Sequence, residues 1–318
     1  MRVLQAFESC PMGFGGASIS GEGAGYGFGA MDEKTAINLL HEARDLGVKL
    51  FDTAPIYGFG LSEERFGKAF KKSRQDVFYV SKSGVTWSPM KRVDMTNDPK
   101  TTLSMLETSL RTLQTDYIDL YMIHWPDAKV DIRRPMEVLV KAQREGKIKS
   151  IGLCNTNQKE IELAEEIGVI RAVQNQLNLF ERADVDVFLP WLKQKGISYM
   201  SWGTLDKGIL TGRVDRERKF DQQDCRSWAP WWKAINFEER FQFVERLKPL
   251  MSEREITGVE LAIGHNLAVD GVDMVLCGAR TSEQLKGCLS SLKPLDSKLM
   301  QQVLEIGKSY YDSLSKSV

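Results

Sequence analysis

Short apolar runs alternate with segments of helical spacing along the whole chain. The runs are rich in valine, isoleucine, leucine and aromatic residues, which is typical of strands buried on both faces of a sheet. Eight such runs predict strands: residues 12–16, 48–52, 77–81, 117–124, 148–154, 171–176, 197–202 and 272–278.

The segments between these runs predict helices. One apolar stripe consists of Ala36, Leu39, Leu40, Ala43 and Leu46, and a second of Leu103, Leu106, Leu110 and Leu113. Both stripes have the spacing that places apolar side chains on one face of an α-helix. Asp98 and Pro99 are suited to the N-cap and first position of the second helix.

Strands that alternate with helices form a parallel sheet, and eight is the number of strands that closes a (β/α)₈ barrel. The sequence therefore predicts an α/β fold, a TIM barrel, as one domain over residues 1–318. A cover near residues 1–11 and a long loop at 213–236, after the seventh strand, complete the prediction. That loop contains three tryptophans, which argues against disorder.

The stretch around residues 25–52 offers a competing interpretation. Gly25, Gly27 and Ala30 fit the G-x-G-x-x-A pattern of a Rossmann dinucleotide site, with Asp52 as the ribose-binding acid. That pattern must directly follow a strand, whereas "ASISGEGA" precedes it, and eight glycines lie between residues 13 and 29. The barrel is therefore favoured over the Rossmann site.

Composition narrows the possible partners. The 318 residues carry 43 basic and 43 acidic side chains, so a nucleic acid or an anionic membrane is not expected as a partner. No apolar signal core or membrane-spanning run occurs. Five cysteines without a C-x-x-C pattern indicate reduced thiols in the cytoplasm, and three histidines do not favour a metal site. A monomer is the default expectation.

Four polar residues lie at or just after consecutive predicted strand ends. They are Asp52, Tyr57, Lys82 and His124. Each alone is commonly a loop charge or a packing residue. In a barrel, however, the carboxyl ends of the strands meet on one rim, where active sites are built. The series of four therefore predicts one shared pocket.

These four side chains together fit carbonyl reduction. A free phenol has a pKa of about 10 and is a weak acid at neutral pH. A neighbouring Lys82 ammonium is predicted to lower the pKa of Tyr57, and Asp52 to hold Lys82 in place. Tyr57 is then suited to donate a proton to a substrate oxygen that His124 orients. The reaction also needs a hydride donor.

Residues at the later strand ends are suited to bind that donor. The amides of Asn155 and Gln174 suit a nicotinamide carboxamide, and Trp202 offers a flat face for ring stacking. Gly278 precedes a predicted helix start that favours phosphate. Arg280 is suited to pair with a 2′-phosphate, which predicts NADPH as the cofactor.

At this point nearly the whole chain resembles the aldo-keto reductase superfamily. The resemblance is carried, in order, by "FDTAPIYG", "VSKSG", "LYMIHWPD", "IGLCNTN", "QNQLNLF", "SWGTLDKGILTGR" and "GARTSEQL". It implies a (β/α)₈ barrel that interconverts small-molecule carbonyl compounds and alcohols with NADPH/NADP⁺. It also implies a catalytic tetrad at Asp52, Tyr57, Lys82 and His124. The implied cofactor contacts are Asn155, Gln174, Trp202, Gly203, Thr204, Leu205, Gly278, Ala279, Arg280 and Gln284.

The sequence departs from the family pattern at three places. Cys154 replaces the usual serine before the carboxamide-binding asparagine, and Gly203–Thr204 replaces a Ser-Pro pair. Cys288 stands where an asparagine often contacts adenine.

Aromatic residues are expected to wall the substrate pocket. Phe59, Trp87 and Trp125 are assigned to it, and the tryptophans of the 213–236 loop, Trp228, Trp231 and Trp232, are further candidates.

Two other functions fit the same scaffold. One is an aldose or alcohol dehydrogenase that works in the direction of oxidation. The other is a redox-sensing regulatory subunit, like the channel-associated β subunits.

Overall fold

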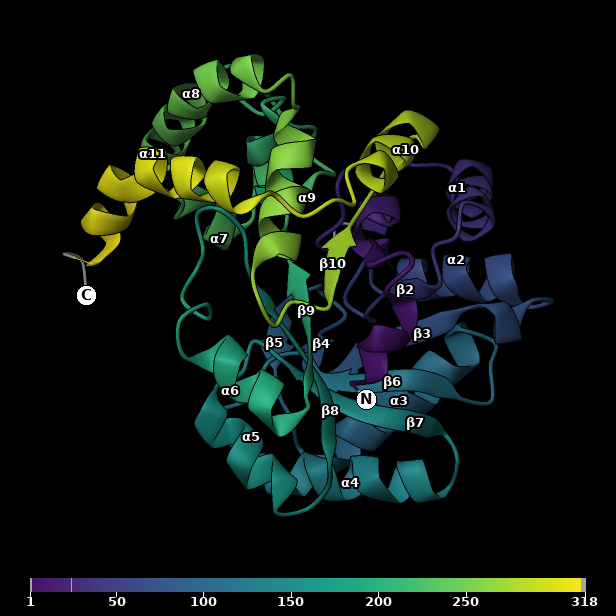
Figure 1. Cartoon of the computed structure of the whole chain (residues 1–318). Helices are drawn as coiled ribbons and strands as arrows, with labels where there is room; N and C mark the ends of the chain where they lie inside the picture. Colours follow the sequence, from purple (N-terminus) through teal and green to yellow (C-terminus); the bar gives the residue numbers. More distant parts are fainter. Residues whose placement is uncertain (1, 24, 316–318) are drawn as a thin grey trace.

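The structure, a computed structural model, describes residues 2–23 and 25–315. Its centre is a closed barrel of eight parallel strands in the order β1-β10-β9-β8-β7-β6-β3-β2 (Figure 1). The strands are β1 (Met12–Gly15), β2 (Leu50–Asp52), β3 (Phe78–Ser83), β6 (Ile118–Ile123), β7 (Ile148–Cys154), β8 (Ile170–Gln176), β9 (Ser198–Trp202) and β10 (Met274–Cys277). Each overlaps one predicted strand, so the predicted barrel is confirmed. Met1 and residues 316–318, the ends of the predicted domain, lie outside the described residues.

Helices follow the strands around the barrel. They are α1 (Glu33–Asp45), α2 (Leu61–Phe70), α3 (Pro99–Thr112), α4 (Arg133–Arg144), α5 (Gln158–Glu165), α6 (Phe188–Lys195), α9 (Gly258–Ala268) and α10 (Ser282–Ser290). Both predicted apolar stripes lie on helices, α1 and α3. Asp98 accepts a hydrogen bond from the Thr101 amide at 3.0 Å, and Pro99 occupies the first turn of α3, as predicted.

The barrel interior is apolar below the rim. Its cluster contains Leu4, Leu50, Val80, Leu120, Met122, Cys154, Ala172, Met200, Met274 and Leu276. Leu4 belongs to the short 3₁₀ helix η1 (Val3–Phe7), which packs against β8 and β9. The Leu4 amide donates to Ser198 Oγ at 3.0 Å. The predicted N-terminal cover therefore closes the end of the barrel at which the strands begin. The opposite rim, where the strands end, is left open.

A second apolar cluster lies beside the barrel. It is formed by α7 (Pro230–Lys233), α8 (Phe237–Glu253) and α11 (Ser297–Ser315), and Figure 1 shows α8 in green lying close to α11 in yellow. The predicted long loop is interrupted by η6 (Cys225–Ser227) and by α7, and Trp232 is buried in the cluster. The structure therefore gives this loop an apolar anchor.

An antiparallel hairpin absent from the sequence prediction follows β3. It consists of β4 (Val85–Trp87) and β5 (Val93–Met95). Each strand has three residues, too short to show a clear alternating pattern. The hairpin stands at the carboxyl end of the barrel strands and so contributes to the rim.

The remaining short 3₁₀ helices connect these elements. They are η2 (Gly16–Ile19), η3 (Gly21–Gly23), η4 (Arg74–Asp76) and η5 (Asp206–Thr211). Because η2 and η3 separate β1 from the glycine pattern at residues 25–30, that pattern does not form a Rossmann turn.

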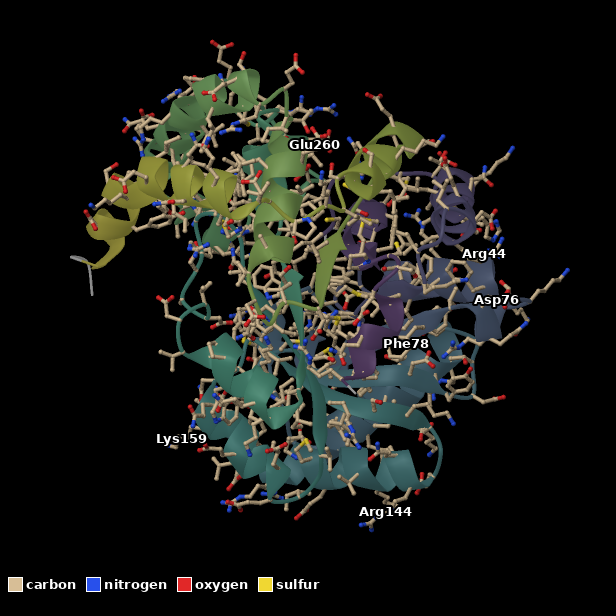
Figure 2. The ribbon with its side chains drawn as sticks, in the orientation of Figure 1. Arg44, Asp76, Phe78, Arg144, Lys159 and Glu260 are labelled. Carbon is tan, nitrogen blue, oxygen red and sulfur yellow. The ribbon has the colours of Figure 1, made fainter. Side chains whose placement is uncertain are left out.

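Charged side chains project from the outside of the molecule (Figure 2). Asp76, Arg144 and Lys159 are exposed examples. Among the residues that the structure describes, no helix is both long enough and apolar enough to cross a membrane.

One acidic side chain is buried between the barrel and its helices. Glu63, near the start of α2, is 1% exposed, and its Oε1 accepts a hydrogen bond from Ser81 Oγ at 2.6 Å. Burial raises the pKa of Glu63 to about 7. Ionisation of Glu63 therefore lowers the free energy of unfolding. This loss is absent below the unfolded pKa of about 4.3, where the carboxyl group is protonated in both states.

We expect this contribution to be lost between about pH 4.5 and pH 7, by up to about 3 kcal/mol. Glu63→Gln should remove that pH dependence, because the amide does not ionise. Urea unfolding of both proteins at several pH values measures the difference, with Glu64→Gln on the same helix as the control. A wild-type-minus-variant difference that stays constant with pH would contradict this expectation.

Candidate active site

A buried ion pair lies at the carboxyl ends of β2 and β3. The ammonium of Lys82 donates to Asp52 Oδ1 at 2.8 Å and to Oδ2 at 2.7 Å. It also donates to the carbonyl of Thr53 at 2.8 Å, which uses its third proton. Asp52 is 3% exposed and Lys82 is fully buried. Asp52 therefore contacts a lysine, as the sequence analysis expected.

Tyr57 and His124 complete the cluster. Tyr57 follows β2, and its ring lies with its centroid 5.2 Å from Lys82 Nζ. The rings of Tyr57 and His124 meet edge to face at 5.8 Å. The structure thus brings all four predicted side chains together, with Lys82 behind the other three.

Burial of this cluster favours a protonated phenol. Burial raises the pKa of Tyr57 to about 12, and the Lys82 ammonium only partly offsets it. Lys82 does lower the pKa of Tyr57, as predicted, but burial outweighs the ammonium, so the pKa of the phenol stays above its ordinary value. At neutral pH the phenol of Tyr57 is therefore protonated.

His124 is held neutral. Burial lowers the pKa of its imidazole well below the ordinary value, and the Lys82 charge acts in the same direction. Burial also disfavours charge on Lys82, but the Asp52 carboxylate more than compensates and raises the lysine pKa. The cluster therefore presents one fixed cation and two neutral hydrogen-bonding rings.

A cavity of about 1270 Å³ opens over this cluster. Asp52, Tyr57 and His124 line one end. The wall also contains most of the predicted cofactor contacts, which are Asn155, Gln174, Trp202, Gly203, Thr204, Leu205, Gly278, Arg280 and Gln284. Ala279 instead lies buried behind the wall, where its carbonyl accepts a hydrogen bond from Ser18 Oγ at 3.0 Å.

The two predicted amides are already oriented by the chain. Gln174 Nε2 donates to Asp52 Oδ2 at 2.8 Å, which links it to the buried ion pair. Asn155 Nδ2 donates to the His124 carbonyl at 2.8 Å, and its Oδ1 accepts from Trp202 Nε1 at 3.0 Å. These bonds fix the plane of the Trp202 ring against the cavity.

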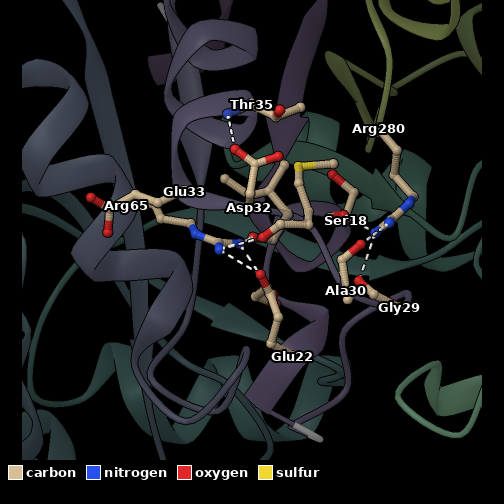
Figure 3. Close-up of polar contacts among 12 residues, drawn as sticks. Ser18, Glu22, Gly29, Ala30, Asp32, Glu33, Thr35, Arg65 and Arg280 are labelled. Atoms are coloured by element: carbon tan, nitrogen blue, oxygen red, sulfur yellow. Dashed lines mark hydrogen bonds and ion pairs between the residues drawn. The ribbon is translucent and has the colours of Figure 1, made fainter.

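Arg280 lines the same cavity and holds the glycine-rich segment. Its guanidinium donates to the carbonyls of Ser18, Gly29 and Ala30 at 3.1, 2.9 and 2.6 Å (Figure 3). Its own backbone amide donates to Gln284 Oε1 at 2.9 Å. Gln284 therefore supports the position of Arg280.

A second arginine holds the other side of the same segment. Arg65, on α2, donates to Glu22 Oε1 at 2.7 Å and to the Met31 carbonyl at 2.6 Å, and it also contacts the Ile19 carbonyl (Figure 3).

The predicted aromatic wall is only partly present. Trp125 lines the cavity and is 37% exposed. Phe59 and Trp87 pack on each other at 5.1 Å and are not among the described residues that line it. Trp231, one of the candidate tryptophans of the 213–236 loop, also lines the wall, and its ring stacks on that of Tyr26 at 6.4 Å.

The sequence analysis named only the tryptophans among the wall residues of the 213–236 loop, and it named none from the glycine-rich segment. These two segments meet, because the Cys225 amide donates to the Gly27 carbonyl at 2.9 Å and Phe28 pairs with Asp224. They add aromatic and cationic side chains to the cavity: Tyr26, Phe28, Arg213, Arg218, Lys219, Phe220, Arg226 and Trp231. The clustering of tyrosine and phenylalanine among the glycines was the available signal.

Comparison with known proteins now places this site. A sequence profile described as "Aldo/keto reductase family" matches residues 11–308. The chain belongs to the aldo/keto reductase family. Its site is therefore that of an oxidoreductase that acts on small-molecule carbonyl compounds.

The names of two relatives of this aldo/keto reductase specify different cofactors. The aldo-keto reductase YhdN of Bacillus subtilis is 35% identical over 285 residues, 87% of this chain and 86% of the relative. The NADH-specific methylglyoxal reductase of Escherichia coli is 29% identical over 92% of this chain and 94% of its own. An aldo-keto reductase of Schizosaccharomyces pombe, yakc [NADP(+)], is 28% identical over 84% of this chain and 80% of its own.

Solved structures show the same architecture. The glycerol dehydrogenase of Gluconobacter oxydans has a TM-score of 0.82 and 29% identity, over 94% of this chain and 92% of its own. An aldo-keto reductase of Bacillus halodurans, in its holo form, has a TM-score of 0.77 and 25% identity, over 93% of this chain and 91% of its own.

Two of the departures of this aldo/keto reductase from its family pattern have structural roles. Cys154 is fully buried inside the barrel, where its thiol contacts Met122 Sδ at 3.7 Å. Thr204 Oγ1 donates to the Leu276 carbonyl at 3.2 Å, and the Gly203 carbonyl accepts from Asn178 at 2.9 Å. The contacts of Gly203 and Thr204 join the end of β9 to its neighbours, and the Cys154 contact joins β7 to β6.

Proposed function

We propose that this protein is an NADPH-dependent reductase of aldehydes or ketones, with Tyr57 as the proton donor. The observation that carries the proposal is the protonated Tyr57 beside the buried Lys82–Asp52 pair, at the inner end of a cavity that reaches Arg280. Five free thiols fit a reducing cytoplasm as the place of action. The default state that we propose is a monomer.

The residues of the cavity fit a nicotinamide dinucleotide. Trp202 presents a ring of fixed orientation, and Asn155 and Gln174 present oriented amides. Arg280 supplies positive charge in the same cavity. The cofactor, when bound, supplies the hydride. Trp202 would stack on its nicotinamide ring, and Arg280 would pair with its 2′-phosphate.

The protein's own task is to bind the substrate oxygen and protonate it. The Tyr57 hydroxyl donates a hydrogen bond to that oxygen, and the neutral His124 imidazole supplies a second. As negative charge develops on the oxygen, the Tyr57 proton moves to it. The fixed charge of Lys82 stabilises the tyrosinate that remains, while Asp52 and Gln174 hold Lys82 in place.

The oxidation direction is the alternative with a specific observation in its favour, because one structural neighbour is a glycerol dehydrogenase. Oxidation needs a tyrosinate to accept the proton, and the raised pKa of Tyr57 disfavours that form at neutral pH. We therefore expect reduction near neutral pH, with oxidation gaining only at alkaline pH.

A screen of NADPH oxidation with aldehydes, ketones, quinones and sugars tests the proposal. The loss of the reduced-nicotinamide absorbance reports turnover. If the protein binds NADPH but none of these compounds causes NADPH oxidation, the result would instead support the redox-sensing regulatory subunit.

Arg280→Ala is expected to weaken NADPH binding by about 10- to 100-fold and to change NADH binding little. A charge-assisted contact to the 2′-phosphate contributes about 1.5–3 kcal/mol. Fluorescence titration with each cofactor measures both affinities.

Arg65→Lys is the control for this test, because it loosens the same glycine-rich segment without changing charge. If Arg280→Ala weakens NADPH and NADH equally, Arg280 acts only by holding the segment. That result would remove the basis for the NADPH preference.

A further inference from the structure

Two polar side chains of α2 are buried against the barrel. Ser62 and Glu63, in the first turn of this helix, are 0% and 1% exposed. A polar side chain buried in this way costs folding free energy unless it makes a hydrogen bond. A Cβ atom at Gly16 would collide with the Ser62 oxygen and the Asp52 carbonyl. The start of α2 therefore packs closely against the end of the strand that carries Asp52.

Ser62 supports one of the groups that hold the Lys82 ammonium. Thr53 Oγ1 donates to Ser62 Oγ at 2.8 Å. The carbonyl of the same Thr53 accepts a hydrogen bond from Lys82 at 2.8 Å. The backbone amide of Ser62 also donates to the Tyr57 carbonyl at 3.2 Å. One residue of α2 is therefore bonded both to a residue that orients Lys82 and to Tyr57 itself.

Glu63 supports the strand from which Lys82 projects. Ser81 Oγ donates to Glu63 Oε1 at 2.6 Å, and Ser81 directly precedes Lys82 on β3. Successive side chains of a strand point to opposite faces, so Ser81 faces α2 while Lys82 points into the barrel, as Val80 does. A contact that fixes Ser81 from outside the barrel therefore also fixes the backbone from which the lysine side chain begins.

The effect of Lys82 on Tyr57 depends on the distance between them. The ammonium lies 5.2 Å from the centroid of the Tyr57 ring, and the interaction between two charges falls as their distance grows. Asp52 accepts two hydrogen bonds from the ammonium, and the Thr53 carbonyl accepts the third. If Thr53 turned away from its Ser62 contact, the ammonium would lose an acceptor and could move away from the phenol.

We propose that Ser62 and Glu63 are positioning residues, which hold the Lys82 ammonium at the distance from Tyr57 that proton transfer requires. Neither is among the described residues that line the cavity, so both act through the strand residues to which they are bonded. This inference rests on the proposed function, because it takes Tyr57 to be the proton donor and Lys82 to stabilise the tyrosinate.

Ser62→Ala and Glu63→Met each remove one of the two supports. Ser62→Ala deletes a single oxygen and keeps the amide that bonds to Tyr57. Glu63→Met keeps an unbranched side chain and takes away the acceptor of Ser81. We expect each variant to slow single-turnover hydride transfer to an aromatic aldehyde about 5- to 10-fold, the effect of one lost hydrogen bond. The dissociation constant of NADPH should not change.

Glu63→Gln is the conservative variant that should restore the rate, measured at pH 6. Burial raises the pKa of Glu63 to about 7, so at this pH most of the carboxyl groups are protonated and the neutral amide resembles them. The amide oxygen can still accept the hydrogen bond from Ser81. Glu64→Gln, at the next and partly exposed position of α2, is a second control and should leave the rate unchanged.

A change of background separates positioning from general damage to the fold. Asp52→Asn combined with Lys82→Met removes the charge that the two residues are proposed to position. In that background, Ser62→Ala and Glu63→Met should cause no further loss of rate, because the ammonium is absent. A merely structural role would lower the rate by the same factor in both backgrounds.

Two results would overturn the positioning role. Unchanged rates in both variants would mean that Lys82 is held without α2, and equal losses in both backgrounds would mean that α2 supports only the fold. Ser62→Ala decides the question alone if circular dichroism shows that Glu63→Met does not fold. A wild-type protein that binds NADPH and transfers hydride to no aldehyde would overturn the proposed function instead.

Discussion

Tyr57→Phe is expected to slow hydride transfer to an aromatic aldehyde by at least about 100-fold, and by up to about 10⁴-fold. The substitution keeps the ring against His124 and Lys82 and removes only the hydroxyl that carries the proton. Dinucleotide affinity should change little, since the residues proposed to bind it lie on other strands. Single-turnover kinetics with separate fluorescence titration measure the two effects independently.

Tyr117→Phe is the matched control for this prediction. Tyr117 lies just before β6, at the amino end of the barrel strands, with its ring against Arg74 and Lys149. Its hydroxyl is remote from the cavity, so turnover should be retained. If Tyr57→Phe reduces the aldehyde at nearly the wild-type rate, the proton comes from another group and the mechanism fails.

Lys82→Met is expected to have the second largest effect and to act on both turnover and stability. Without the ammonium, the tyrosinate left by proton transfer lies in a buried site with no opposite charge, so turnover should fall by about 100-fold or more. Asp52 would also remain buried and unpaired, which typically costs about 3–5 kcal/mol of folding free energy.

A second variant separates these two effects. Asp52→Asn combined with Lys82→Met removes both charges, so we expect most of the stability to return while turnover stays low.

Asp52→Asn alone should reduce turnover less than Lys82→Met, because it leaves the lysine charged. The losses from Tyr57→Phe and Lys82→Met should not add in the double variant, since both disable one proton transfer. Additive losses would mean that Lys82 acts on a different step.

The barrel could be predicted from the sequence because every buried parallel strand leaves a local signal. The β6 run, with five apolar residues among Ile118–Ile123, can be recognised without any knowledge of its neighbours. The hairpin of β4 and β5 left no such signal, because three-residue strands are too short to show a pattern. The positions of Asp52 and Lys82 at adjacent strand ends were enough to predict their contact.

Properties that depend on how deeply a side chain is buried, or on contacts between residues far apart in the sequence, could not be predicted in the same way. The net rise of the Tyr57 pKa could not be predicted, because the sequence shows the neighbouring lysine, which lowers the pKa, and does not show the degree of burial, which raises it more. The contacts of Arg280 with Gly29 and Ala30 join residues about 250 positions apart. Stacking of Tyr26 on Trp231 likewise depends on how two long loops fold over the rim.

The central claim is that the chain positions a nicotinamide cofactor to transfer hydride to a carbonyl carbon while Tyr57 protonates the oxygen. The most direct test uses NADPH that carries deuterium at the transferable position of the nicotinamide, with an aldehyde that the protein reduces. Mass spectrometry then locates the label in the alcohol. The account predicts one deuterium on the carbinol carbon for each NADPH oxidised, and an alcohol formed without that label would contradict it.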